Sequence, residues 1–457
     1  QAGYDQALSG GTPVVDPSTG QLLIMPRRFN QLGYAPAAAP LGGVPLISTT
    51  PLDQSFGNVA LVPPGNPNSW WERHSTPIPI QNNTLNLAGP RVTNVPGNLT
   101  DTFRQAGPAF TLFGRQYYND EYSNIFIGPA DRFKGVAAWC RQRGRPIYGK
   151  TQISTTHEGA TVPFMPLIQN VAHKYQGLKE EGCSGLMGVW NFGSFLTPIT
   201  AIANRFSWEP LPESVDAAAR EVATLYYGQA VADAVVKAWE QFCQAAQTYP
   251  LSIPVLYHQP LNRGPAYPLF FDPADEPTAD SWLDQPLRNH RPSDWLNRPF
   301  EPEVYIRGFS QMLDGWRQAI ATLKEAKGLV APEFRHAYDR DLAVAECYAI
   351  LIEANLNVTR VALARDRLHG GASPEECLEL LDEMERTCQD QLRLIQAIKP
   401  VLERDSRLGF HGEAYTYLID DRSLDEAEVA ARDILVRRIP AWRRRVAPPG
   451  AVASDFA

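Results

Sequence analysis

Residues 131–154 read DRFKGVAAWCRQRGRPIYGKTQIS, a stretch whose first half has the pattern of a helix and whose second half has the pattern of a strand. Apolar residues recur at helical spacing on one face of the first half: Phe133, Val136, Ala137 and Cys140. Gly144 is a helix stop, and the segment from Pro146 to Ser154 is a strand candidate.

The same order is repeated directly downstream. A second helix is expected over Leu167 to Glu181, with a stop at Gly182, and a second strand over Gly185 to Trp190. An α-β-α-β order with short connections predicts parallel strands and right-handed crossovers, hence an α/β segment over 131–212. The carboxyl ends of such strands are where α/β sheets and barrels bind ligands.

The regions on either side differ in composition. Residues 1–130 hold 16 of the 39 prolines and no lysine, and we expect an irregular, loop-rich, β-containing N-terminal region there. From 213 to 457 we expect an all-α domain interrupted by a proline-rich connector over 250–302. Apolar residues recur at helical spacing over 213–249, and long amphipathic stretches follow over 303–327, 332–369 and 373–399. Ser373, Pro374 and Glu376 have the pattern of a capping box.

Composition excludes several classes of function. A chain of 457 residues and 50.7 kDa is long enough for two or three domains. The net charge of −8 argues against binding to nucleic acid, and the arginines over 437–445 are explained by a helix end and a solvated tail. No apolar run reaches the roughly 18 to 20 residues of a membrane span. The chain begins at Gln1, which fits a removed leader or a trimmed chain, so a cytoplasmic or a secreted location stays open.

Signatures of cofactors are missing. The six cysteines form no C-x-x-C pair, and the eight histidines are dispersed, so neither a metal site nor a disulfide scaffold is indicated. The sequence contains neither a P-loop nor a dinucleotide glycine fingerprint after a strand. We therefore expect no metal and no cofactor.

The first group of candidate site residues follows the first strand. Gln152 lies in the extended segment, and His157 and Glu158 come where the strand would leave the sheet. A carboxylate at such an edge, beside an imidazole, can act as a general acid, a base or a nucleophile once burial changes its pKa. The alternative is a loop in which Glu158 is a cap and the preceding threonines bind turn amides.

Two further groups lie near the ends of neighbouring segments. Trp190 and Asn191 at the end of the second strand offer an aromatic platform and an amide, which suit the apolar faces and polar edges of sugars. Tyr118, Asp120 and Glu121 lie upstream. Asp120 or Glu121 is the candidate for the second carboxylate that glycosidic cleavage requires. Each group also has a structural interpretation, with Trp190 in the core and the tyrosine-rich segment as a surface loop.

Two later segments could reach the same site from the helical region. One is the rigid turn that contains Asn262 and Arg263, and the other runs from Asp405 to Glu413. Both also fit loops that fasten the helical part to the α/β part through ion pairs.

Together, the segments from Phe133 to Trp190, from Asn262 to Pro268 and from Asp405 to Glu413 resemble the C-terminal portion of bacterial glycoside-hydrolase-like proteins. The resemblance covers about residues 125–440. It implies a partial or complete (β/α)₈, TIM-barrel-like fold followed by a helical domain, and it places Glu158 and Trp190 at a sugar site. Where those proteins have an aromatic residue before the glutamate, this chain has His157.

The resemblance leaves the N-terminal region unmatched. A complete barrel needs about 250 residues, and six more β/α units do not fit into 130 proline-rich residues. One interpretation is a glycoside hydrolase that is a fragment or one subunit of a split enzyme. The other is a structural, scaffold or carbohydrate-binding subunit on a degenerate glycosidase fold, whose N-terminal region docks on a partner subunit or another copy.

Overall fold

The computed structural model describes residues 109–118, 123–129, 131–144, 146–154, 157–188, 196–275, 292, 295–296, 300–412, 414 and 416–446, with 14–15 and 22–24 as backbone. The chain divides into two compact units. One comprises Gln1–Gly107 and Ala138–Arg145, and its described strands β1 (Val14–Val15) and β2 (Leu22–Ile24) pair antiparallel. The other comprises Pro108–Ala137 and Pro146–Ala457 and, apart from residues 138–144, contains the features below.

The α/β segment has the expected order of elements. Helix α6 (Asp131–Gln142) precedes strand β5 (Tyr148–Lys150), and α7 (Ile168–Glu180) precedes β6 (Gly185–Met187). β5 and β6 pair in parallel, with Gly149 opposite Leu186. The prediction of two parallel strands joined through a helix is therefore confirmed. The strand predicted to reach Ser154 ends earlier, because the chain bends at 153–154 and the Ser154 hydroxyl donates to Pro163 O at 3.3 Å.

The described strands do not close into a barrel. Each described sheet has two strands, and the other pairs in this unit are antiparallel: β3 (Ala109–Leu112) with β4 (Arg115–Tyr118), and β7 (Phe410–His411) with β8 (Thr416–Tyr417). After β6 the described chain continues into helices rather than into another strand, so a single α-β-α-β unit is present there. The described residues are mostly helical.

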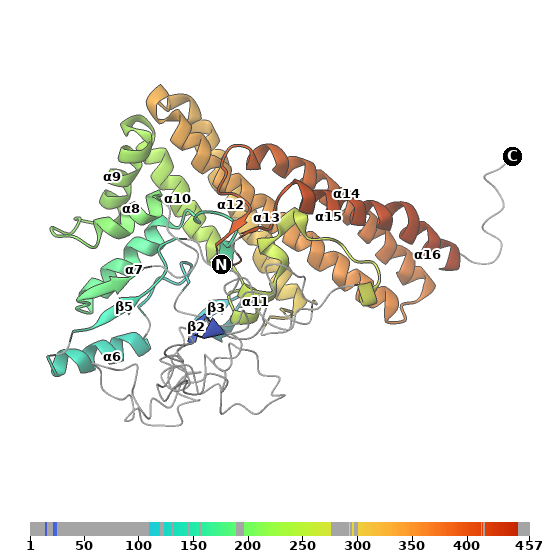
Figure 1. Cartoon of the computed structure of the whole chain (residues 1–457), viewed down its shortest axis with the longest axis horizontal. Helices are drawn as coiled ribbons and strands as arrows, with labels where there is room; N and C mark the ends of the chain where they lie inside the picture. Colours follow the sequence, from blue (N-terminus) through green and yellow to red (C-terminus); the bar gives the residue numbers. More distant parts are fainter. Residues whose placement is uncertain are drawn as a thin grey trace. The chain divides into compact units, whose positions relative to one another are not determined.

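The helical region follows the predicted pattern (Figure 1). Its helices are α8 (Pro198–Arg205), α9 (Val215–Tyr227), α10 (Ala232–Ala246), α11 (Ile253–His258), α12 (Pro302–Ala326), α13 (Arg335–His369), α14 (Pro374–Leu402), α15 (Asp421–Asp433) and α16 (Ile439–Val446). The stretch 213–249 is split into α9 and α10 at Gly228, whose φ of +88° is unfavourable for other residues. The connector 250–302 contributes α11 and the short turns η5 (Pro260–Asn262), η6 (Gly264–Ala266) and η7 (Pro273–Asp275).

Helix α14 begins with the predicted N-cap. The hydroxyl of Ser373 accepts from Glu376 N at 3.2 Å, and Pro374 occupies the first helical position. The Glu376 carboxylate pairs with Arg367 at 2.5 and 3.0 Å, and it also accepts a hydrogen bond from the Ser373 backbone. The N-cap is thus confirmed, and the glutamate links α14 to the end of α13.

Charged residues one heptad apart on α13 bind the neighbouring helices. Glu353 pairs with Arg317 of α12 and Arg393 of α14, each at 2.5 Å. Glu346 pairs with Lys324 of α12 at 2.7 Å and with Arg404 just beyond α14. These pairs, with the packing of α13 between α12 and α14, fix the register of the three long helices (Figure 1).

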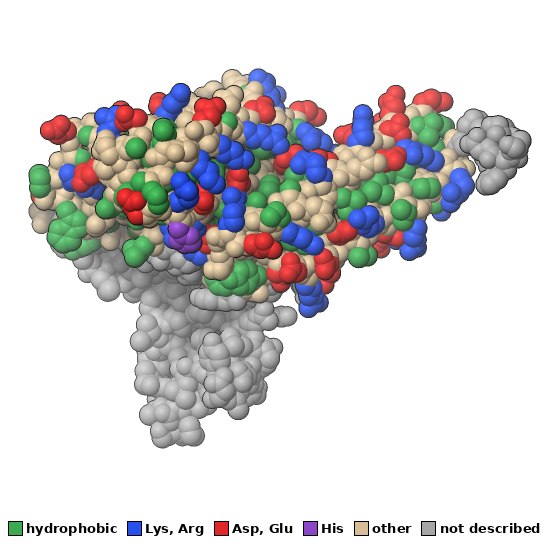
Figure 2. Space-filling model, turned by 90° about the horizontal axis from the view of Figure 1, so that it is seen from above, with side chains coloured by type: hydrophobic (Ala, Val, Ile, Leu, Met, Phe, Trp, Pro, Cys, Tyr) green, Lys and Arg blue, Asp and Glu red, His purple; other side chains and the backbone are tan. Residues whose placement is uncertain are grey.

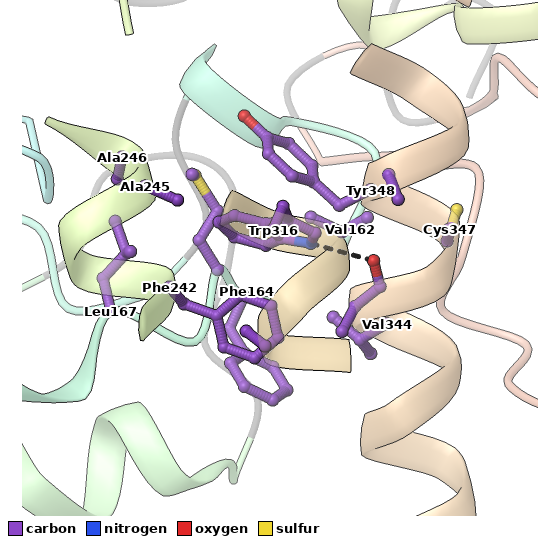
Figure 3. Close-up of a cluster of buried hydrophobic side chains, with 14 of the residues drawn as sticks. Val162, Phe164, Leu167, Phe242, Ala245, Ala246, Trp316, Val344, Cys347 and Tyr348 are labelled. Atoms are coloured by element: carbon purple, nitrogen blue, oxygen red, sulfur yellow. Dashed lines mark hydrogen bonds between the residues drawn. The ribbon is translucent and has the colours of Figure 1, made fainter. Parts of the chain in front are cut away.

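One hydrophobic core contains side chains from both the α/β segment and the helices (Figure 3). Trp316 of α12 lies between Phe242 of α10 and Tyr348 of α13, with ring centroids 4.4 and 4.8 Å apart. Its indole N–H donates to Ala345 O at 3.0 Å, so the buried polar group is satisfied. Phe164 and Leu167, which precede α7, pack in the same cluster, so this core joins the α/β segment to the bundle.

Helix α13 lies at the centre of this arrangement. Among the described residues one helical stretch, Pro332–His369, is long and apolar enough by composition to cross a bilayer, and 83% of its most apolar window is buried. Its N-terminal half packs in the core of Figure 3, and its C-terminal half packs in a second apolar cluster with α14 and the π-helical turn Ile434–Arg438. Burial on all sides accounts for its composition.

Candidate functional site

Glu158 lies in a buried turn that follows β5 in the chain after residues 151–156. The turn η3 (His157–Gly159) is a single 3₁₀ turn, and its three residues are buried. The Glu158 side chain is only 1% exposed. The chain that follows β5 therefore places a carboxyl group in the core.

The Glu158 carboxyl group is held by residues upstream of the α/β segment. Asn124 N donates to its Oε1 at 2.8 Å, and the Ser123 hydroxyl forms a further hydrogen bond with it. Burial raises the pKa of Glu158, while these hydrogen bonds and the charge of Lys174 act in the opposite direction. The net effect favours the protonated carboxyl relative to an ordinary glutamate.

The backbone of the turn is fixed from three other segments. Tyr348 of α13 donates to Glu158 O. Asn262 accepts from Ala160 N at 2.9 Å and donates to His157 O at 3.1 Å. Gly409 N donates to Thr161 O at 2.8 Å. Segments far apart in the sequence thus determine where Glu158 lies.

The segment Ser123–Ile125 lies between this turn and α7. Asn124 Nδ2 donates to Ser154 O at 2.7 Å. From the other side, Asn170 of α7 donates to the carbonyls of Asn124 and Ile125 at 3.3 Å, and Lys174 donates to Ser123 O. Buried polar groups on both sides therefore set the position of the two residues that contact Glu158.

His157 lies beside a second histidine. His411 in β7 has its ring centroid 6.0 Å from that of His157, and both rings are buried. His411 Nδ1 accepts from Ala414 N at 3.1 Å, which assigns its ring proton to Nε2. Burial, with a smaller effect of His157, lowers the pKa of His411 to about 3, so this imidazole is neutral at physiological pH.

Buried tyrosines complete the surroundings. Tyr249 and Tyr348 both interact electrostatically with Glu158, and burial raises the pKa of each well above its ordinary value. Gln259 donates to the Tyr249 hydroxyl, and Tyr305 donates to Gln259 Oε1 at 3.2 Å. The phenols remain neutral and act as hydrogen-bonding groups.

The structure brings only some of the predicted site residues to Glu158. Asn262 contacts the turn directly, and His157 belongs to it. Gln152 is buried, 1% exposed, between β5 and the turn. Arg263 lies near Tyr267 and the acidic Asp420 and Glu426 of the α15 region, and burial lowers its pKa. Arg263 thus fits a fastening role, which was one of its two interpretations.

Other predicted residues cannot be placed at the site. Tyr118 is described as backbone in β4. The remaining four lie outside the described residues: Asp120, Glu121, Trp190 and Asn191. Their roles remain predictions.

Comparison of the chain with protein-family models, with curated proteins and with solved structures finds no match.

Sequence reasoning missed five residues of the site: Ser123, Asn124, Lys174, Tyr348 and His411. Lys174 follows Asn170 by one helical turn beside the apolar face of α7, which is the one signal that could have indicated a buried cation. His411 lies in the segment that was expected either to reach the site or to fasten the domain, and it does the former. In the same segment Arg407 pairs with Asp405 at 2.6 Å, which is an ion pair within the loop itself.

Away from this turn, acidic and basic side chains form ion pairs with near neighbours. Figure 2 shows acidic and basic side chains side by side over much of the face in view. Near the C-terminus Arg438 pairs with Asp433 at 2.9 Å and with Asp272 at 2.7 Å, and Arg443 pairs with Glu385 at 2.7 Å. Within the described part of the chain, no three His, Cys, Asp or Glu side chains gather as metal ligands.

Proposed function

We propose that this chain is a carbohydrate-active protein, a glycoside hydrolase in which Glu158 is the proton donor. The observation that supports this most directly is the buried carboxyl group of Glu158, which Asn124 holds while three other segments fix its turn. Catalytic groups need positions set by their supporting contacts, and this turn has them.

The chemistry fits the position. A glycosidic oxygen must receive a proton as the bond to the sugar breaks, and a carboxyl group with a raised pKa holds that proton near neutral pH. Burial acts on Glu158 in this direction. After the proton has left, the Asn124 N–H and the Ser123 hydroxyl stabilise the carboxylate.

The partner carboxylate and the sugar contacts come from the sequence interpretation. Asp120 or Glu121 supplies the nucleophile or the base, and Trp190 and Asn191 bind the sugar. The resemblance to bacterial glycoside-hydrolase-like proteins supports these roles, and a relationship to (β/α)₈ barrels belongs to the same proposal.

The test compares E158Q with the wild type on aryl glycosides of several sugars. For each sugar, one leaving group departs readily without a proton, and another requires one. Loss of the acid lowers kcat/KM about 10²-fold to 10⁴-fold on the second kind and much less on the first. E240Q is the control, because Glu240 is exposed on α10. Wild-type inactivity on every glycoside would remove the enzyme proposal.

A second candidate is a non-catalytic scaffold or carbohydrate-binding subunit. The observation that favours it is the enclosure of Glu158, which is 1% exposed and hydrogen-bonded to the chain's own residues. Titration calorimetry with oligosaccharides, and the mass in solution with and without residues 1–125, separate this candidate from the first. Sugar binding without turnover, or an assembly that requires residues 1–125, would support it.

A further inference from the structure

Helix α7 presents a buried cation to the site. Lys174 is 3% exposed, and Asn170, one turn earlier on the same flank, is also 3% exposed. Burying an ammonium group costs several kcal/mol unless hydrogen bonds and an opposite charge compensate. Lys174 donates to Ser123 O, and the carboxylate of Glu158 provides an opposite charge when it is ionised.

The two ionisable groups lie on opposite sides of one short peptide segment. Ser123 offers its carbonyl to Lys174 and its hydroxyl to Glu158, and the next N–H, that of Asn124, donates to Glu158 at 2.8 Å. Ser123 and Asn124 are 2% and 1% exposed. A change at Lys174 therefore reaches Glu158 both through its charge and through the donors it holds in place.

The other ionisable groups facing Glu158 are of a different kind. Tyr249 precedes α11 and Tyr348 lies on α13, and both phenols are neutral. His157 is in the same turn as Glu158. His411 of β7 lies beside His157 and is neutral. Among the described charges that act on Glu158, Lys174 is the cation.

We propose that Lys174 is a positioning residue of this site, which fastens Ser123 and Asn124 against Glu158 and stabilises the carboxylate that remains when Glu158 gives up its proton. The inference rests on the proposed function, in which Glu158 must release a proton and take one back. A carboxyl group buried without a compensating cation would hold its proton too firmly to donate it.

The first experiment uses unfolding and requires no substrate. The free energy of unfolding is measured against pH for the wild type and E158Q, and the difference between them reports the protonation of Glu158. The same comparison is then made between K174M and the double variant K174M/E158Q. We expect the midpoint of the difference to move to higher pH, because the removed charge is one that lowers the pKa of Glu158. K179M is the matched control, since Lys179 is on the same helix and pairs with Glu209 at 3.4 Å near the surface. An unchanged midpoint in K174M, or an equal shift in K179M, would overturn the proposal.

Further variants keep the result decisive. If K174M does not fold, S123A retains the carbonyl that binds Lys174 but lacks the hydroxyl that binds Glu158, and we expect an upward shift of the midpoint. An unchanged midpoint in S123A would then count against the proposal that Lys174 acts on Glu158 through Ser123. If glycoside hydrolysis is found, the loss of activity at high pH moves upward in K174M by the same amount as the unfolding midpoint. Absence of any hydrolysis would reject the proposed function and leave the unfolding result to judge Lys174.

Discussion

At the scale of single residues, Glu158 combines burial with hydrogen bonds that favour its charged form. Burial is the larger effect, so the folded pKa lies above the unfolded one. For an acid with a raised pKa, the stabilising contribution is present at low pH and is lost as pH rises from the unfolded pKa through the folded pKa. The wild-type protein therefore loses stability at neutral pH in order to keep this carboxyl group where it is.

The first prediction follows from the loss of stability that the raised pKa of Glu158 causes as pH rises. E158Q replaces the carboxyl with a neutral group of similar shape, and we expect it to be more stable than the wild type at pH 7. The gain is about 1.4 kcal/mol for each unit by which the folded pKa exceeds the unfolded one. It disappears as pH falls toward about 4, the ordinary pKa of a glutamate. Urea unfolding at a series of pH values measures it, with E240Q as the exposed control. Lower stability of E158Q at pH 7 would mean that the pairing with Lys174 outweighs burial.

The candidate site residues were chosen from local features of the sequence. Glu158 and His157 were selected because they follow a strand, and Asn262 because it lies in a rigid turn. Lys174 and Asn124 were missed because their importance depends on the path of Ser123–Ile125 between α7 and the turn. Nothing near those residues in the sequence shows that the chain returns there.

At the scale of elements, the long helices were predictable because each has a periodic apolar face and marked ends. The predicted stretches 303–327, 332–369 and 373–399 correspond to α12, to α13 with the 3₁₀ turn before it, and to α14. Strand length was not predictable. β5 and β6 are three residues each, and neither has a further partner among the described strands.

The second prediction concerns the start of α14. S373A removes the acceptor for Glu376 N and is expected to cost about 1 kcal/mol, independent of salt. E376Q retains the cap and weakens only the exposed pair with Arg367, so its cost is smaller and decreases as salt is added. Thermal unfolding at low and high ionic strength distinguishes the two. A salt-dependent loss in S373A would show that the cap acts mainly through the ion pair.

At the scale of the molecule, the turn of Glu158 is completed by a loop close to the C-terminal end of the described chain. Gly409 has φ of +83°, and a Cβ there would overlap with Ile419 O. The glycine thus allows the β7–β8 hairpin to fold tightly while Gly409 N donates to Thr161 O. No periodicity in the sequence indicates this contact, because it depends on the folded bundle bringing the two segments together.

The third prediction tests the close approach of Gly409 to Ile419. G409A combines a strained backbone with a steric clash and is expected to cost about 3 kcal/mol or more. G371A is the matched control. Gly371 has φ of +92°, but a methyl group there would meet no described atom within 4 Å beyond its chain neighbours. G371A is therefore expected to lose only the roughly 1 kcal/mol that comes from the strained backbone. Denaturant midpoints of the two variants measure the difference. Equal losses would show that the hairpin can shift to accept a methyl group.

The bond between Gly409 and Thr161 also has a consequence for biosynthesis. Translation delivers the Glu158 turn well before it delivers Tyr348, and Gly409 and His411 later still. A nascent chain that stalls before the β7–β8 hairpin already contains Asn124, Asn262 and Tyr348, but it lacks the Gly409 bond to Thr161 and the neighbouring His411. Truncated products of this kind therefore carry Glu158 in a turn that lacks the last of the contacts that fasten it.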